Sequence, residues 1–284
     1  MRAQRRRWAL LLWLGVGALF SAGCAGGVLE DGRAKALRIA SEAGFSPARV
    51  DAGPFVLLSY AKGRRGASER LVVYIEGDGR PWQNRYVPSV DPTPLNPIGL
   101  ELAIQDPAPL VVYIARPCQY TRDLDRRTCH PRFWATHRYA EEVLDATNRA
   151  IDHYRTALGA SQIELVGYSG GGAVAALVAA RRTDVAALTT VVAPLDHAVW
   201  TAHHDVSPMN GSLNPADFAE RLQAIPQLHL VGDDDSIVPE KIARAYGAKL
   251  AGAPQMRIVP IDDYDHDCCW VRDWAKLRRD FAPN

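Results

Sequence analysis

The sequence lacks the excess of basic residues that marks nucleic-acid-binding chains. Its 33 lysines and arginines almost balance its 32 aspartates and glutamates, for a formal net charge of +1. Four of the arginines lie within the first seven residues, so the chain without residues 1–23 has 29 basic and 32 acidic residues. A protein that binds a polyanion needs a concentrated basic patch. We therefore expect no nucleic-acid partner.

Internal repeats and low-complexity linkers are also missing. The apolar run Trp8–Phe20 spans 13 residues, which is short of the roughly 20 that a transmembrane helix requires. With no linker to divide it, a chain of 284 residues with 48% apolar content fits one large domain with a substantial core.

The N-terminus has the layout of an export signal. Met1–Arg7 is basic, Trp8–Phe20 is apolar, and the small residues Ser21-Ala22-Gly23 precede Cys24. This pattern resembles the lipobox of bacterial lipoproteins, although Ser21 stands where leucine is commonest. The resemblance implies removal of residues 1–23, lipidation of Cys24, and anchoring in the cell envelope, at the outer membrane facing the periplasm. An uncleaved signal anchor and plain secretion are the alternatives.

Cysteine is scarce, and the four cysteines beyond Cys24 form an even set. An exported chain with Cys118, Cys129, Cys268 and Cys269 is expected to hold two disulfides, for which three pairings are possible. Adjacent cysteines bond to each other only with strain. Pairing of Cys268 and Cys269 separately with Cys118 and Cys129 is therefore attractive, but the sequence does not choose.

Beyond a tether over residues 24–52, which is weakly helical around Ala34–Ala43, buried strands alternate with helices through residues 53–284. Nearly continuous apolar runs predict a mostly parallel sheet covered by helices on both faces. In such sheets ligands bind at the carboxyl ends of the strands, so the loops after these strands should share one face. The predicted strands are 55–60, 71–75, 110–115, 163–166, 187–193, 228–231 and 256–261, and the main helices are 98–105, 133–158, 239–250 and 271–281.

The most informative stretch is Ile163–Gly172, where a buried strand runs into a helix across Gly167-Tyr168-Ser169-Gly170-Gly171. This is G-x-S-x-G in a strand–turn–helix context. The cramped turn requires small residues two positions either side of Ser169, which Gly167 and Gly171 supply. Such a turn holds a serine oxygen at the positive end of the following helix. The alternative is a glycine-rich turn that only packs closely.

Two later loops supply the partners that a nucleophilic serine needs. In Gly232-Asp233-Asp234-Asp235 a strand delivers a carboxylate-rich turn, from which we choose Asp235. His266 follows the last strand and precedes the last helix. A histidine acts as general base when a carboxylate holds its other nitrogen. The chain order serine, aspartate, histidine is that of nucleophile-elbow hydrolases.

Together these motifs resemble the α/β-hydrolase superfamily from about Phe55 to Asn284, most of all the uncharacterised exported or lipoprotein serine hydrolases of Gram-negative bacteria. The resemblance implies an α/β-hydrolase fold with a small lid or none. It also implies an acyl-enzyme on Ser169, with His266 as base and Asp235 as its partner. The backbone N–H groups of Gly170 and Asp78 would bind the oxyanion, although Glu76 occupies the place where many relatives have histidine.

The resemblance implies no cofactor, and we expect no metal. The spacing of His266, Asp267, Cys268 and Cys269 is too tight for a structural zinc site. The expected substrate is a small-molecule or lipid ester, with a pocket rim formed by the Trp82 loop, the Cys118–Cys129 loop and Trp200.

Two alternatives remain open for the activity. The same three residues would serve an amidase, a thioesterase or an acyltransferase. The second alternative is a non-catalytic envelope lipoprotein that binds a ligand or acts as a scaffold. Such a protein has no need of Ser169, Asp235 and His266 in this order.

Overall fold

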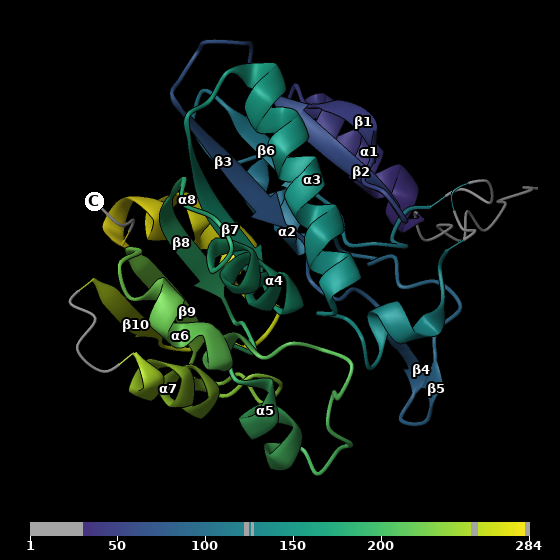
Figure 1. Cartoon of the computed structure of the whole chain (residues 1–284), viewed down its shortest axis with the longest axis vertical. Coiled ribbons are helices and arrows are strands. Elements are labelled where there is room, and N and C mark those ends of the chain that lie inside the picture. Colours follow the sequence, from purple (N-terminus) through teal and green to yellow (C-terminus); the bar gives the residue numbers. More distant parts are fainter. Residues whose placement is uncertain (1–30, 122–124, 126–127, 251–254, 282–284) are drawn as a thin grey trace, which may run out of the picture. The chain divides into compact units, whose positions relative to one another are not determined.

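The computed structural model describes residues 31–121, 125, 128–250 and 255–281. These residues form an eight-stranded sheet with helices on both faces and a separate small hairpin (Figure 1). Within these ranges no helix has the length and apolarity needed to span a bilayer. The predicted signal sequence over residues 1–23 and the lipidation of Cys24 lie outside the described residues.

The sheet has the strand order β1-β2-β6-β3-β7-β8-β9-β10. β2 pairs antiparallel with β1 and β6, and all the remaining neighbours pair in parallel. The predicted mostly parallel α/β sheet is therefore confirmed. The strands are β1 Ser46–Asp51, β2 Val56–Lys62, β3 Arg70–Ile75, β4 Trp82–Asn84, β5 Val87–Pro88, β6 Val111–Ile114, β7 Gln162–Tyr168, β8 Val185–Val191, β9 Gln227–Gly232 and β10 Met256–Ile261.

Side chains of the central strands point alternately to two hydrophobic layers. In β3, Leu71 and Val73 join one buried cluster while Val72 and Tyr74 join the other, as the two-residue period of a strand requires. Helices α3, α4 and α7 cover the first face, and α1, α2 and α8 cover the second. The helices are α1 Gly32–Glu42, α2 Ile98–Ala103, α3 Glu141–Leu158, α4 Gly170–Ala179, α5 His197–His203, α6 Ala219–Leu222, α7 Glu240–Lys249 and α8 Trp270–Phe281, with 3₁₀ helices at Pro131–Trp134 and Pro215–Phe218.

The long helix predicted over residues 133–158 begins eight residues later, at Glu141. Its first turn holds Glu141 and Glu142, and its last turn holds Arg155. Negative charge near the N-terminus and positive charge near the C-terminus interact favourably with the helix dipole. Gly159 ends the helix in the left-handed conformation, with φ 73°. Residues 133 and 134 end a 3₁₀ helix and residues 135–139 form turns, of which Arg138 and Tyr139 line the candidate site.

The weakly helical stretch predicted around residues 34–43 is a helix, but residues 32–52 belong to the folded unit and do not form a tether. Residues 32–42 form α1, in which Ala36 and Ala40 are fully buried, and β1 pairs along the whole of its length with β2. The compact unit accordingly begins at Asp31 rather than at residue 53. β1 contains a proline, an arginine and an aspartate, so its pairing with β2, rather than its own propensity, makes it a strand.

Candidate active site

Ser169 occupies a sharp turn between β7 and α4, with φ 49° and ψ −126°. Positive φ is uncommon for a residue with a side chain. The turn depends on close backbone contacts on both sides. A Cβ at Gly167 would lie 2.4 Å from the carbonyl oxygen of Gly171, and one at Gly171 would lie 2.3 Å from that of Ile75. Only glycine fits at either position, as the motif predicts.

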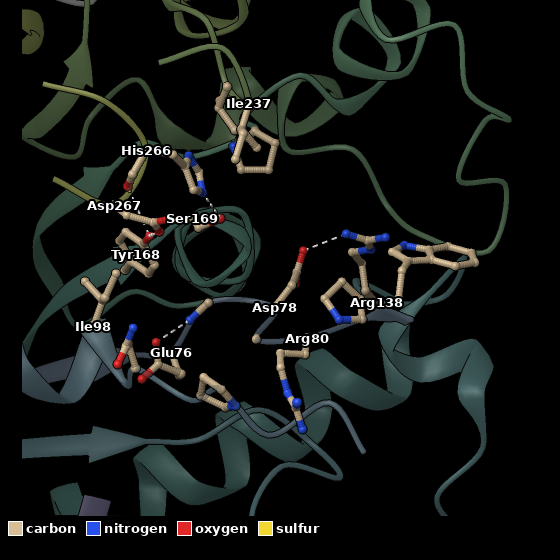
Figure 2. Close-up of a pocket in the computed structure, with 18 of the residues that line it drawn as sticks. Glu76, Asp78, Arg80, Ile98, Arg138, Tyr168, Ser169, Ile237, His266 and Asp267 are labelled. Atoms are coloured by element: carbon tan, nitrogen blue, oxygen red, sulfur yellow. Dashed lines mark hydrogen bonds and ion pairs between the residues drawn. The ribbon is translucent and has the colours of Figure 1, made fainter. Parts of the chain in front are cut away.

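The structure brings Ser169, His266 and Asp235 into one hydrogen-bonded chain. His266 Nε2 lies 3.0 Å from Ser169 Oγ, and His266 Nδ1 lies 2.8 Å from Asp235 Oδ2. These distances are within the reach of proton transfer. Figure 2 shows the histidine ring directed at Ser169 above the start of α4. Residues from three loops, up to 97 positions apart, thus meet at the carboxyl ends of β7, β9 and β10.

The turn after β9 selects one of its three aspartates. Asp235 is buried, while Asp233 and Asp234 are exposed. Asp235 Oδ1 accepts backbone hydrogen bonds from Ile237 and Val238, each at 2.8 Å. This leaves Oδ2 for His266. The turn also needs Gly232, because a Cβ there would lie 2.2 Å from the carbonyl oxygen of Tyr264.

The loop that carries His266 is held by hydrogen bonds around it. The Tyr168 hydroxyl lies 3.1 Å from both the His266 carbonyl oxygen and Asp267 Oδ1, and it can donate to either. Burial and the Asp267 charge raise the pKa of Tyr168 well above its ordinary value, so this donor keeps its proton at physiological pH. Trp270 Nε1 donates to the Asp265 carbonyl at 2.9 Å. These contacts orient His266 before any substrate binds.

The disulfides differ from the pairing favoured above. Cys118 bonds to Cys129, with Cα atoms 5.6 Å apart, and Cys268 bonds to Cys269. Cys118 and Cys129 pack on the face of the sheet that carries α3, whereas Cys269 packs on the opposite face. The sheet therefore separates the two pairs. Across the described ranges, no three histidine, cysteine, aspartate or glutamate side chains are grouped to hold a metal ion.

Gly170 and Asp78, the predicted oxyanion donors, are neighbours in space. A Cβ at Gly170 would lie 2.1 Å from Asp78 Oδ1, so only glycine fits beside this carboxylate. Gly170 is the first residue of α4, whose N-terminus carries a partial positive charge. Among the described residues, the backbone N–H groups of Gly170 and Asp78 donate no hydrogen bond.

Two arginines neutralise the Asp78 carboxylate. Arg138 Nη1 lies 2.7 Å from Asp78 Oδ2, and Arg116 Nη1 lies 3.0 Å from Oδ1. Burial by itself would raise the pKa of Asp78, but the charges of Arg138 and Arg116 outweigh burial and hold the pKa below its ordinary value. The three side chains carry a net charge of +1. The ion pairs thus keep a negative carboxylate beside Gly170 without making the surroundings of Ser169 negative.

Glu76 supports the loop that contains Asp78 from behind. Its Oε1 accepts from the backbone N–H groups of Gly77 and Gly99, at 2.9 and 3.0 Å, and Oε2 accepts from the Tyr113 hydroxyl at 3.0 Å. Burial raises the pKa of Glu76 to about 7, although these hydrogen bonds oppose the shift. Glu76 therefore links the β3 loop to the start of α2.

Glu76→Gln is expected to make the protein more stable at pH 8 than the parent, with little difference at pH 5. The raised pKa means that the contribution of Glu76 to stability is complete below pH 4.5 and is lost as the pH rises through about 7. The shift corresponds to roughly 3 kcal/mol at most. Glutamine keeps an oxygen for both N–H groups and carries no charge. Urea unfolding at both pH values measures the difference, and equal differences at pH 5 and pH 8 would contradict the assignment.

A cavity of about 680 Å³ opens beside Ser169 and His266 (Figure 2). Trp82 and Trp200 line it, as predicted for its rim, but none of the described residues between Cys118 and Cys129 does. The Cys118–Cys129 loop instead supports the loop after β3, because Gln119 Nε2 donates to the Gly77 carbonyl oxygen at 2.9 Å. The remaining wall includes Pro94–Asn96, Ile98, Arg138, Tyr139, Pro194, Met209, Ile237 and Val238.

Sequence reasoning missed the two arginines. Arg116 lies two residues after the end of β6 and could have been found by its position at the carboxyl end of a strand. Arg138 lies in turns that were predicted to be helical. It does not follow a predicted strand, so nothing in the sequence placed it near the site. Its partner is 60 residues away, and only the folded chain brings them together.

Comparisons with known proteins agree with this fold. The family model described as "Serine hydrolase (FSH1)" matches residues 109–255. No curated protein matches the chain. Among solved structures, the chain is similar to Est1E from Butyrivibrio proteoclasticus, with 14% identity and a TM-score of 0.58 over 83% of this chain and 96% of that one.

Two further structures show the same fold. A serine hydrolase homologue from Coxiella burnetii has 16% identity and a TM-score of 0.55 over 84% of this chain and 97% of its own. An α/β serine hydrolase without a lid from Xanthomonas campestris has 14% identity and a TM-score of 0.53 over 84% and 96%. At these identities the likeness concerns the fold alone, which is that of the α/β hydrolases.

Proposed function

Because this chain belongs to the serine hydrolase (FSH1) family, we propose that it cleaves a carboxylic ester through an acyl-enzyme on Ser169. The observation that carries the proposal is the unbroken hydrogen-bond chain from Ser169 through His266 to the buried Asp235. A serine hydroxyl is a weak nucleophile until an adjacent base accepts its proton. Here the base is within reach, and a carboxylate holds its other nitrogen.

In the acylation step, Ser169 Oγ attacks the ester carbonyl carbon while His266 Nε2 accepts the hydroxyl proton. Asp235 stabilises the imidazolium that forms. The carbonyl oxygen takes the electron pair of the broken π bond and becomes an oxyanion. As the tetrahedral intermediate collapses, the carbon–oxygen bond to the alcohol breaks and His266 returns its proton to the leaving oxygen. The acyl group remains on Ser169.

The oxyanion is stabilised by the backbone N–H groups of Gly170 and Asp78 and by the N-terminus of α4. A carboxylate beside a developing oxyanion would raise the barrier if its charge were uncompensated. Arg116 and Arg138 remove this penalty by pairing with Asp78. Water then attacks the acyl-enzyme, with His266 as base, and releases the carboxylic acid.

The proposed setting is the cell envelope. The basic and apolar segments ahead of Cys24 support export, and the small residues before this cysteine support lipid attachment. The cavity beside Ser169 presents Trp82, Leu95, Trp200 and Ile237, which favours an ester with an apolar acyl or alcohol group.

A fluorophosphonate probe is expected to label Ser169 covalently, and peptide mapping of the labelled chain would locate the adduct. The probe reacts only with a serine whose proton a base accepts, so His266→Ala should lose the labelling although Ser169 is intact. Circular dichroism of both forms establishes that they are folded. Labelling of another serine, or none in the folded protein, would refute the proposed mechanism.

A further inference from the structure

Exposed apolar side chains gather near the mouth of the cavity. Eight large apolar side chains are exposed in the described part of the chain, and five of them lie between residues 82 and 95. Tyr86 and Val87, on the β4–β5 hairpin, are 83% and 45% exposed. The five are Trp82, Tyr86, Val87, Val90 and Leu95.

This hairpin stands at the rim of the cavity. Arg80, Pro81 and Trp82 line the cavity at the base of the hairpin. The hairpin is fastened to the body of the protein by Trp134, whose Nε1 donates to the Ser89 carbonyl at 3.0 Å. In Figure 1 it projects from the rest of the domain. Across the mouth, Ile237 is 47% exposed and also lines the cavity, and Figure 2 shows it on the opposite side from Arg80.

The charges of the hairpin have one sign. Residues 80–90 include Arg80 and Arg85, both exposed, and no aspartate or glutamate. The next acidic residue, Asp91, pairs with Arg33 at 2.5 Å. Tyrosine and tryptophan favour the interface between water and lipid, and arginines near an anionic bilayer contribute about 1 kcal/mol each. A second copy of this hairpin is a poor partner, because a symmetric contact would bring the same arginines together.

The start of the described chain lies at the same rim. The backbone of Gly32 touches Pro94, since a Cβ there would lie 2.2 Å from the Pro94 carbonyl oxygen, and Lys35 Nζ donates to Asn96 Oδ1 at 3.0 Å. Only residues 25–31 separate Gly32 from Cys24, and the eight residue steps between them span at most about 29 Å. Acyl chains on Cys24 would therefore hold the mouth of the cavity close to the bilayer.

We propose that the β4–β5 hairpin docks on an anionic phospholipid bilayer and turns the mouth of the cavity toward it. The Tyr86 and Val87 side chains enter the interface, and Arg85 faces the lipid phosphates. The cavity then takes its ester from the lipid phase rather than from water. Uptake of the ester from the lipid phase rests on the proposed esterase activity, whereas docking of the hairpin does not.

Docking is tested with the chain from Ala25 onward carrying Ser169→Ala, so that binding is measured without turnover. This form keeps the whole unit from Asp31 to Asn284, including the complete sheet and both hydrophobic clusters. We expect it to float with vesicles of phosphatidylcholine and phosphatidylglycerol and to bind pure phosphatidylcholine at least about tenfold more weakly, since arginine attraction requires anionic lipid.

The double variant Y86S/V87S should lose at least about tenfold in affinity for the anionic vesicles, because it removes the side chains that enter the interface. R85Q should weaken binding to the anionic vesicles and leave binding to pure phosphatidylcholine vesicles unchanged. L37S is the matched control, since Leu37 on α1 is also exposed, at 48%, and should bind like the parent. Equal binding by Y86S/V87S and the parent, no binding by the parent, or a dimer in sedimentation that Y86S/V87S dissociates would overturn the proposal.

Uptake of the ester from the lipid phase is measured separately, in the catalytically intact chain. Y86S/V87S should cleave p-nitrophenyl acetate in solution like the parent but lose at least about fivefold on a long-chain p-nitrophenyl ester carried in anionic vesicles. Equal loss on both substrates, or no loss on either, would overturn it. A parent that cleaves neither ester would instead refute the esterase proposal and leave the docking result standing.

Discussion

Ser169→Ala is expected to lower kcat/KM for p-nitrophenyl acetate by at least about 10⁴-fold. The hydroxyl oxygen that forms the acyl-enzyme is removed, and no neighbouring atom replaces it. Ser169 Oγ lies 3.0 Å from His266 Nε2, and alanine leaves that nitrogen facing the cavity with nothing to deprotonate except water. The remaining rate should reflect only substrate binding and oxyanion stabilisation.

The fold should tolerate this change, because alanine is smaller than serine and the glycines around the turn remain. Thermal unfolding of the variant and the parent tests this point. Ser161→Ala is the matched control, since Ser161 is exposed just before β7, at the opposite end of that strand, and its loss should leave kcat/KM unchanged. A Ser169→Ala variant that keeps more than a few per cent of the parent's activity would rule out the acyl-enzyme.

Asp235→Asn is expected to lower kcat by about 10⁴-fold while the fold is retained. The asparagine oxygen can still accept from the backbone of Ile237 and Val238, as Asp235 Oδ1 does at 2.8 Å. Its amide nitrogen then faces His266 Nδ1 and donates to it. That hydrogen bond places the imidazole proton on Nε2, so the nitrogen facing Ser169 can no longer accept a proton.

Asp234→Asn is the control for this substitution. Asp234 is the adjacent residue in the same turn, but its side chain is exposed, and of the three aspartates in this turn only Asp235 hydrogen-bonds to His266. The kinetics of this variant should match those of the parent. If Asp234→Asn lost activity and Asp235→Asn did not, the choice among the three aspartates would be wrong.

Some features of the fold were beyond prediction from local pattern. β1 carries Pro47, Arg49 and Asp51, and it is a strand because β2 offers an edge to pair with. The helix predicted from residue 133 begins at Glu141, since apolar spacing does not distinguish a packed turn from a helix. The sequence left the disulfide pairing open, and the pairing that it made attractive is not the one formed. The face of the sheet that each cysteine occupies depends on the completed fold.

The sequence by itself determined the seven strands of the main sheet from β2 onward and the three residues that meet at the site. Ser169 and Asp235 follow the buried strands β7 and β9, and His266 follows the edge strand β10. Parallel strands deliver such positions to one edge whatever the details of packing. Only the tertiary structure decided the pairing of Asp78 with Arg116 and Arg138, the buried support from Glu76, and the apolar rim at the mouth of the cavity. These depend on contacts between loops distant in sequence, whose geometry is set by the packed sheet beneath them.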